Sequence, residues 1–437
     1  MEYANQISEI INAFSPAPLQ IDQMDKFYCK GTMEYRTSDK YNSPIEDIFD
    51  SCRNSEERAA FLLLGHRGCG KSTELNRMSK KLISQGYCVK TIACGVDLDL
   101  FNIVYSDLFI LMGEALLKIA KDLGCKIEKN IMNDIIAFWS EGTETVISQE
   151  VREIDVEAGM SVESGGLFAG ILKIFEKIKT DLKFNEEIRK EYRRKISVRS
   201  SEWIRIIGCV SEEIARKTGG KRPIIIFEDL DKLNPEDAWK VFYNYAAILS
   251  GMMFPVIYTF PIGLSYDTRF SAVESYFVTK TLPMIKIETI ENQPFREGMD
   301  IIQEIVKKRA NLELFEQDVL KKLIQYTGGS LRDLFHAINS SAKRAERRDS
   351  ETVSMEDAER ALEELKTSLT RRIEEKDYNF LLNIYNGNKE RIEDKEMLLK
   401  MLQASVVLEY NGKRWHNVHP LVVKFFKEQG LILGARE

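Results

Sequence analysis

The sequence has few cysteines and no long apolar run. Its 437 residues include seven cysteines, none of them in a C-x-x-C pair, and an odd number in a long chain favours a reducing cytoplasm over a disulfide framework. The N-terminus carries Glu2 and Glu9 and no apolar core, so we expect no signal peptide. The uncharged stretch from Ala246 to Tyr266 is broken by Gly251 and Pro255, which indicates a helix end and a buried strand instead of a membrane span. We expect a soluble, cytoplasmic protein that does not associate with membranes.

An excess of positive charge is absent as well. The chain has 62 Lys and Arg against 68 Asp and Glu, a net charge of −6. This balance argues against nucleic-acid binding over the whole surface, although it leaves room for a local basic patch. A hydrophobic content of 44% and a charged content of 30% are typical of globular proteins, and the length allows two or three domains.

One stretch carries a specific chemical signature. Four apolar residues, Phe61 to Leu64, precede a match to the phosphate-binding pattern G-x-x-x-x-G-K-[ST]. The match consists of Gly65, His66, Arg67, Gly68, Cys69, Gly70, Lys71, Ser72 and Thr73. The glycines let backbone N–H groups converge on an anion, and the helix that follows adds its positive end. Lys71 is expected to reach the β- and γ-phosphates, Ser72 to ligate Mg²⁺, and Cys69 to be a small residue that fits the loop.

Strands and helices alternate on both sides of this loop. Apolar runs at 61–64, 87–92, 223–227 and 254–261 predict strands, and 284–290 predicts a further one. Helical patterns follow the P-loop to about Ser84 and cover 107–123. Strands separated by helices imply right-handed crossovers, so we predict an α/β fold with a parallel sheet.

A second site lies where the strand 223–227 ends. The run continues with three acidic residues, Glu228, Asp229 and Asp231, at the sheet edge where nucleotides bind. One carboxylate there is expected to hold the Mg²⁺ shell, and its neighbour to orient the attacking water. Thr259, in the next strand, is either a polar sensor of the γ-phosphate or an ordinary β-branched strand residue.

The remaining segments predict four parts. They are an N-terminal helix and strap (1–55), a core (56–290) with an insertion at about 126–200, a helical lid (291–368), and a winged-helix-like domain (369–437). A helix with a first-turn Pro at 43–49 belongs to the first part, and such a segment often packs near the adenine.

Charge and turn signals mark three of these parts. Within the insertion, 141–163 is acidic and 173–205 is basic, which predicts either a solvated helix face or a nucleic-acid or partner surface. In the lid, Ser330 caps a helix whose first turn holds Arg332, a cation that opposes the helix dipole and therefore suggests a phosphate ligand. In the last part, Asn411-Gly412 predicts a tight hairpin turn.

This arrangement resembles AAA+ ATPases, especially the origin-recognition initiator branch and the related STAND signalling ATPases. The resemblance implies that Glu228 stands in the place of the Mg²⁺-associated Asp and Asp229 in the place of the catalytic Glu. That exchanged order implies slow hydrolysis. The resemblance to AAA+ ATPases also implies that Thr259 is similar to sensor 1 and Arg332 to the sensor 2 arginine. For a trans-acting arginine finger, it leaves Arg269 and Arg296 as alternatives by position.

The function we expect is an ATP-driven, Mg²⁺-dependent switch that hydrolyses ATP. ATP is favoured over GTP because the Asn/Thr-Lys-x-Asp guanine motif is missing. The resemblance implies a homo-oligomer or a partner effector protein, in a signalling or anti-phage defence role. Two alternatives stay open: a DNA-loading ATPase of initiator or transposition type, and a nucleotide-binding subunit that hardly hydrolyses. The C-terminal part has only twelve Lys and Arg against ten Asp and Glu over 371–437, so DNA binding is expected to be weak at best.

Overall fold

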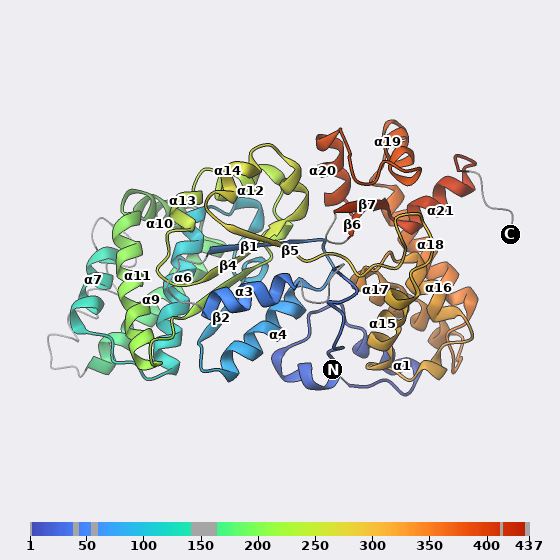
Figure 1. The fold of residues 1–437 in the computed structure, drawn as a ribbon. Coiled ribbons are helices and arrows are strands. Elements are labelled where there is room, and N and C mark those ends of the chain that lie inside the picture. Colours follow the sequence, from blue (N-terminus) through green and yellow to red (C-terminus); the bar gives the residue numbers. More distant parts are fainter. Residues whose placement is uncertain (1, 38–42, 54–59, 141–163, 411–413, 433–437) are drawn as a thin grey trace.

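The computed structural model describes residues 2–37, 43–53, 60–140, 164–410 and 414–432. An α/β part with a group of long helices occupies one side of the molecule, and a helical part occupies the other (Figure 1). The N-terminal end of the chain lies between the two parts. No helix within these ranges is long and apolar enough to cross a membrane.

A five-stranded parallel sheet forms the centre of the α/β part, with the order β2-β3-β4-β1-β5. Its strands are β1 (Ala60–Gly65), β2 (Val89–Ala93), β3 (Ile224–Glu228), β4 (Val256–Pro261) and β5 (Val278–Thr281). β1, β3 and β4 are buried along their whole length, as strands covered on both faces must be. Because parallel strands end at the same edge, the loops after β1, β3 and β4 meet there.

The prediction of a strand at 284–290 was wrong. The fifth strand is Val278–Thr281, at the edge of the sheet beside β1. It is short, polar and half-exposed, so it lacks the continuous apolar run that marks the central strands. In the predicted segment, only isolated bridges form, from Met284 to Tyr410 and from Glu288 to Pro294.

Helices cover both faces of the sheet because its strands alternate their side chains. On one face, Phe61 and Leu63 of β1 pack with α3 (Pro44–Arg53) and α4 (Lys71–Ser84). On the other face, Leu62 and Leu64 join a core that contains α6 (Tyr105–Asp122) and α11 (Ser200–Lys217). Short elements complete this part: α5 (Cys94–Asp97), η2 (Leu100–Asn102), η3 (Leu230–Lys232), α12 (Pro235–Phe242), α13 (Ala246–Leu249), η4 (Ile262–Tyr266) and α14 (Phe270–Glu274).

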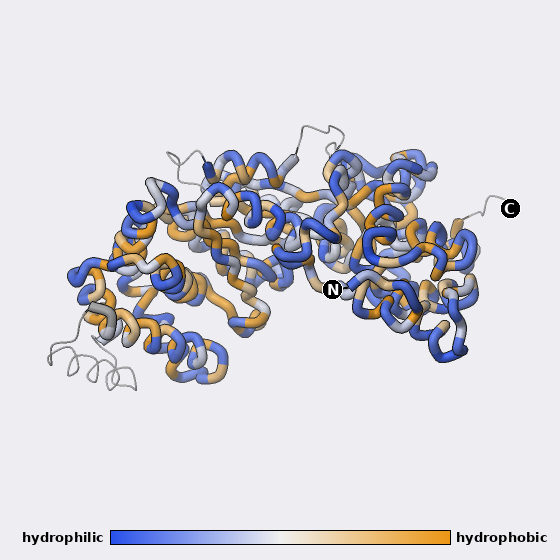
Figure 2. Tube along the Cα trace, turned by 90° about the horizontal axis from the view of Figure 1, so that it is seen from below, coloured by the Kyte–Doolittle hydropathy of each residue, from blue (hydrophilic) through white to orange (hydrophobic). Residues whose placement is uncertain are grey.

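The predicted insertion consists of helices in its described part. α7 (Lys129–Ser140), α9 (Ser164–Phe184) and α10 (Glu186–Val198) pack with α6 and α11. The alternation of hydrophobic and hydrophilic segments along such helices is visible in Figure 2. Trp203 is fully buried at their centre and donates its indole N–H to Phe109 O at 3.0 Å. The acidic segment 141–163 lies outside the described residues.

The helical part has one continuous hydrophobic core. It is formed by α1 (Ile7–Ala13), α15 (Arg296–Lys307), η5 (Leu312–Leu314), α16 (Val319–Tyr326), α17 (Leu331–Arg347), α18 (Met355–Thr370), α19 (Glu375–Tyr385), α20 (Lys395–Gln403) and α21 (Pro420–Glu428), with the antiparallel hairpin β6 (Val407–Tyr410) and β7 (Trp415–Val418). We call α15–α18 the lid helices and residues 375–428 the hairpin unit. The hairpin unit follows the predicted order of helices, hairpin and final helix, while the turn at Asn411-Gly412 lies outside the described residues.

Candidate nucleotide-binding site

The P-loop connects β1 to α4 in the predicted strand–loop–helix arrangement. Gly68 has φ +85° and Gly70, which precedes the first turn of α4, has φ +103°. Residues other than glycine rarely adopt this left-handed backbone conformation. A Cβ added to Gly68 would lie 2.6 Å from Cβ of Arg332. The glycine at 68 is therefore required both by its backbone conformation and by the close approach of the first turn of α17.

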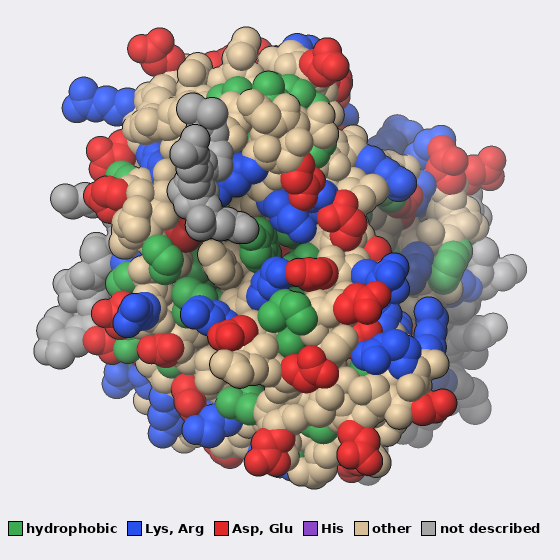
Figure 3. All heavy atoms as spheres, turned by 90° about the vertical axis from the view of Figure 1, so that its right-hand side faces the viewer, with side chains coloured by type: hydrophobic (Ala, Val, Ile, Leu, Met, Phe, Trp, Pro, Cys, Tyr) green, Lys and Arg blue, Asp and Glu red, His purple; other side chains and the backbone are tan. Residues whose placement is uncertain are grey.

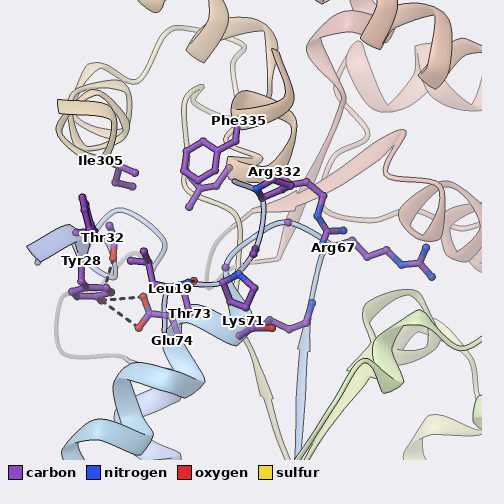
Figure 4. A pocket seen from close by; sticks show the side chains of 18 of the residues that line it. Leu19, Tyr28, Thr32, Arg67, Lys71, Thr73, Glu74, Ile305, Arg332 and Phe335 are labelled. Carbon is purple, nitrogen blue, oxygen red and sulfur yellow. Dashed lines mark hydrogen bonds between the residues drawn. The ribbon is translucent and has the colours of Figure 1, made fainter. Parts of the chain in front are cut away.

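A pocket of about 950 Å³, part of which is open to solvent, lies directly above this loop. Four segments form its walls (Figure 4): the P-loop and start of α4, the residues after β3, the lid helices α15 and α17, and residues 16–36, which we call the N-terminal strap. The strap contains η1 (Ile21–Gln23) and α2 (Met24–Phe27). The strap thus forms one wall of the pocket. The helix at 43–49, considered for a place near the adenine, is α3 and does not line the pocket.

Polar contacts attach the strap to α4. Tyr28 donates its hydroxyl hydrogen to Oε1 of buried Glu74 at 3.0 Å, and Leu19 N–H donates to Oγ1 of Thr73 at 3.3 Å. Burial, followed by the nearby Glu74 charge, raises the pKa of Tyr28 to about 12, so this hydroxyl remains a donor at neutral pH. Thr73 is therefore a residue that orients the strap.

Lys71 lies at the floor of the pocket with all three N–H donors engaged. Its Nζ donates to Gly65 O at 2.7 Å and to His66 O at 2.9 Å, and it forms an ion pair with Oδ2 of Asp231 at 2.9 Å. Burial acts to raise the pKa of Asp231, but the charges of Lys71, Arg67 and Lys232 outweigh it and leave that pKa below its usual value. The sequence marks Asp231 only as the third acid of the run after β3.

Glu228, at the end of β3, lies near Ser72, in the first turn of α4. Oε1 of Glu228 is buried without a partner in the described part of the chain. Burial raises the pKa of Glu228, and the charges of Asp229 and Asp231 act in the same direction, whereas the Ser72 side chain acts to lower it. An unpartnered carboxylate oxygen beside a P-loop hydroxyl fits a hard cation with oxygen ligands. Among the described residues there is no group of three or more His, Cys, Asp or Glu that could hold a metal ion by itself.

Asp229 lines the same pocket from a strained position. Its φ is +71°, and its carboxylate accepts from Gly95 N–H at 3.3 Å and pairs with Nζ of Lys232 at 2.5 Å. A non-glycine residue in the left-handed region costs about 1–3 kcal/mol and is often found at functional sites. The carboxylate therefore lies at the pocket edge near β2, where it contacts the segment that follows that strand.

Thr259 is buried and hydrogen-bonded within the protein, away from the pocket. Its hydroxyl donates to Phe227 O at 3.3 Å and accepts from Leu230 N–H at 3.1 Å. These bonds fix the turn that presents the acids after β3. Of the two alternatives for Thr259, the geometry favours the β-branched strand residue over the phosphate sensor.

Three arginines line the pocket near the P-loop. Arg67 and Arg332, both expected there, line it, and Arg67 donates to Lys232 O at 3.1 Å (Figure 4). Arg36 had no sequence signal, yet its two terminal nitrogens donate to Cys69 O and Pro283 O, each at 2.6 Å. It is 2% exposed and holds the P-loop backbone from behind.

The other proposed residues lie elsewhere. His66 is fully buried and turns away from the pocket, where its Nε2 accepts the Glu409 N–H of β6 at 2.8 Å. Burial, with smaller effects of Lys71 and His416, lowers the pKa of His66 to about 3. Cys69 is buried, as a residue that fits the loop should be. Neither finger candidate lines the pocket: Arg269 pairs with Asp267, and Arg296 is exposed at the start of α15.

The sequence profile of the KAP family P-loop domain matches residues 39–259, just over half of the chain. The chain belongs to the KAP family. The matched range of this KAP-family chain includes the P-loop and the acids after β3, and the five-stranded parallel sheet confirms the predicted P-loop NTPase fold. A comparison with curated proteins finds no match.

Several solved structures overlay on the KAP-family chain at low similarity. Cdc6p from Pyrobaculum aerophilum is 12% identical with a TM-score of 0.38, over 96% of this chain and 98% of that one. ORC2 from Aeropyrum pernix, in ADPNP-ADP complexes, is 11% identical with a TM-score of 0.38, over 89% and 94%. Drosophila ORC bound to DNA is 11% identical with a TM-score of 0.39, over 92% and 78%. At these scores the overlays carry no argument about what the KAP-family chain does.

Proposed function

We propose that this protein is a Mg²⁺-dependent, ATP-binding and ATP-hydrolysing switch. The observation that carries the proposal is one pocket with two chemically different ends. Lys71, Ser72 and Asp231 line one end, with Glu228 near Ser72, whereas Leu19, Phe27 and other apolar side chains of the strap and lid helices form the other. A triphosphate joined to an aromatic base has this same division of chemistry.

Each residue at the phosphate end has a role in this proposal. Lys71 and the P-loop N–H groups bind the β- and γ-phosphates, while Arg67 and Arg332 balance their charge. Ser72 and Glu228 would hold Mg²⁺, which neutralises charge on the phosphates when bound. Asp229 orients a water and accepts its proton as the water oxygen bonds to the γ-phosphorus and the β–γ P–O bond breaks, which yields ADP and inorganic phosphate.

The switch part of the proposal rests on contacts between the P-loop and the hairpin unit. His66 bonds to the backbone of β6, and Tyr410 of the same strand donates to Gly328 O at 2.8 Å, next to the turn that precedes α17. One strand therefore contacts both the P-loop and the lid helices. A change in either on nucleotide binding would move the hairpin unit, which we propose assembles with a second copy or with a partner effector, as signalling and defence ATPases do.

A DNA-loading role has less support. Helix α20, the candidate recognition helix, packs on η4, where a Cβ added to Gly263 would lie 3.0 Å from Leu399 O. On the face formed by the lid helices and hairpin unit, acidic and basic side chains are interspersed (Figure 3). Neither feature supplies the uncompensated cations that a phosphate-led interface needs.

The proposal is tested with Lys71→Ala, and Lys240→Ala serves as the control because Lys240 is an exposed lysine outside the pocket. We expect the wild type and Lys240→Ala to bind Mg²⁺·ATP in titration calorimetry and to release phosphate. Lys71→Ala should lose tight binding without losing its folded circular-dichroism spectrum. Wild-type protein that binds no ATP would disprove the proposal, and binding without phosphate release would favour the nucleotide-binding subunit that hardly hydrolyses.

A further inference from the structure

Arg309 is a buried arginine at the apolar end of the pocket. It follows α15, lines the cavity and is 5% exposed. Its immediate neighbours are Phe27 and Cys29 of the strap and Ile305 and Phe335 of the lid helices, so it lies among apolar groups, away from the cluster around Lys71. Figure 4 shows Ile305 and Phe335 on the side of the pocket opposite Arg67.

The contacts of Arg309 leave much of its donor capacity unused. Nη1 donates to Ile305 O at 2.8 Å and to Phe27 O at 3.5 Å. Nε is buried without a partner among the described residues, and within those residues Arg309 forms no ion pair with a carboxylate. A guanidinium has five N–H donors, and buried arginines are normally paired with acids or other acceptors.

The environment of Arg309 is unfavourable to its charge. The guanidinium centre lies 5.0 Å from the ring centroid of Phe335, which partly stabilises the cation. Burial nevertheless lowers the pKa of Arg309 to about 10, so the side chain remains charged at neutral pH. Because this charge lies in the apolar wall of a pocket with only two carbonyl acceptors, a ligand in the pocket can supply a further acceptor.

We propose that Arg309 reads the base of the bound nucleotide by donating N–H bonds to ring-nitrogen acceptors of a purine. The inference rests on the proposed function, because it assigns the apolar end of the same pocket to the base. A purine has the matching features: a flat ring that packs beside Phe335 and unprotonated ring nitrogens that accept from a donor-only side chain. Arg309 is then the specificity-determining residue, separate from the residues that bind phosphate.

The test compares two ligands that share the phosphate chain but not the base. They are the non-hydrolysable β,γ-imido analogue of ATP and inorganic tripolyphosphate, each with Mg²⁺. For Arg309→Met we expect the affinity for the analogue to fall at least tenfold, which equals about 1.4 kcal/mol, whereas the affinity for tripolyphosphate changes less than twofold. Arg309→Lys keeps the charge but not the fork of donors, so it should show an intermediate loss for the analogue alone.

The matched control is Arg189→Met. Arg189 is also buried, donates from Nη1 to a backbone carbonyl (Leu182 O, 3.3 Å), and lies in the α9–α10 region outside the pocket. The Arg189→Met substitution should leave the affinities for the analogue and for tripolyphosphate unchanged. If Arg309→Met does not fold, which a thermal melt would show, Arg309→Lys provides the answer.

Two results would overturn the inference while leaving the proposed function intact. One is an equal loss of affinity for both ligands in Arg309→Met, which would mean that Arg309 only supports the strap. The other is wild-type protein that binds tripolyphosphate as tightly as the analogue, which would mean that the base is not recognised. Wild-type protein that binds neither ligand would instead disprove the proposed function, and this inference with it.

Discussion

Asp231 and Lys71 form an ion pair at 2.9 Å inside the pocket, with side chains only 10% and 6% exposed. The lysine that should bind phosphate is therefore already paired with a carboxylate. For Lys71 to donate to a phosphate it must give up Asp231 or one of its two carbonyl partners. Asp231 and the phosphates would compete for the same ammonium group.

This competition predicts that Asp231→Asn binds nucleotide more tightly. Asparagine keeps the shape of the side chain but removes the charge that attracts Lys71 and repels phosphate. We expect an affinity gain of about tenfold for the non-hydrolysable ATP analogue, or about 1.4 kcal/mol, measured by calorimetry. Asp237→Asn is the matched control, because Asp237 also pairs with a lysine, Lys240 at 2.8 Å, but lies outside the pocket. Weaker binding by Asp231→Asn would mean that the pair persists with nucleotide bound.

Glu228 and Asp229 should separate binding from turnover. Asp229→Asn should bind Mg²⁺·ATP normally and lose about a hundredfold or more of its phosphate release, because asparagine keeps the shape of the side chain but cannot accept the proton of the water. Glu228→Gln should require more Mg²⁺ to reach half-maximal nucleotide binding, because it removes a charged ligand beside Ser72. Both are measured as initial rates and affinities over a Mg²⁺ series. If Glu228→Gln alone stops hydrolysis, the two assignments are reversed.

The contact between His66 and β6 predicts a local stability effect. His66→Leu leaves the buried Glu409 N–H without its acceptor, which should cost about 1–3 kcal/mol in the free energy of unfolding. His66→Gln retains an acceptor at similar reach and should cost less. Hydrogen exchange at the Glu409 amide measures the effect directly, since faster exchange is expected only in His66→Leu. Equal exchange in both variants and the wild type would show that this bond does not hold the hairpin unit on the P-loop.

Buried histidines predict a loss of stability in mild acid. Burial is the main cause that lowers the pKa of His66 to about 3 and those of His416 and His419 to about 4 each. Unfolded histidine titrates near 6.5, so below this pH the unfolded chain binds more protons and stability falls until the folded pKa values are reached. At pH 5.5 the three together should cost about 4 kcal/mol relative to pH 7.5.

The measurement for this pH effect is urea unfolding at pH 7.5 and 5.5. Burial raises the pKa of Glu409 and acts in the opposite direction, so each histidine is judged by the difference between a variant and its parent. His419→Gln should lose about 1.4 kcal/mol less than the wild type over this range. His336 is the exposed histidine of the chain, and His336→Gln is the control. If His419→Gln loses as much unfolding free energy between pH 7.5 and pH 5.5 as the wild type does, the prediction is contradicted.

The parts of the fold that were predictable are those with local causes. The central strands are continuous apolar runs, the P-loop has a fixed spacing, and Ser330 caps α17 by accepting from Asp333 N–H at 3.3 Å. Such signals lie within a few residues of each other. The edge strand β5 was not predicted. It is partly exposed, so its sequence is polar and lacks the apolar run by which the buried strands were recognised.

The unpredicted features of the candidate site depend on residues distant in sequence. Arg36 reaches Pro283 O across 247 residues, and Arg309 reaches Phe27 O across 282. No pattern in one sequence marks such pairs, because an arginine that will be buried has the same local context as an exposed one. The ion pair between Asp231 and Lys71 was also not predicted. The pattern of acids after β3 points to Glu228 and Asp229, and the P-loop pattern predicts that Lys71 binds phosphate, so neither pattern indicates that Asp231 and Lys71 pair with each other. The KAP family itself was also not indicated by the motifs alone.

The order in which the chain is synthesised gives the bond between His66 and Glu409 a further consequence. The two residues are 343 positions apart, so at about 5–20 residues per second a ribosome takes roughly 17 to 70 s to make the second after the first. During this time the nascent P-loop would have neither its β6 neighbour nor the lid helices. A nascent chain that ends before residue 407 would expose the apolar surface against which Leu408, Tyr410 and Trp415 pack, a state that chaperones recognise.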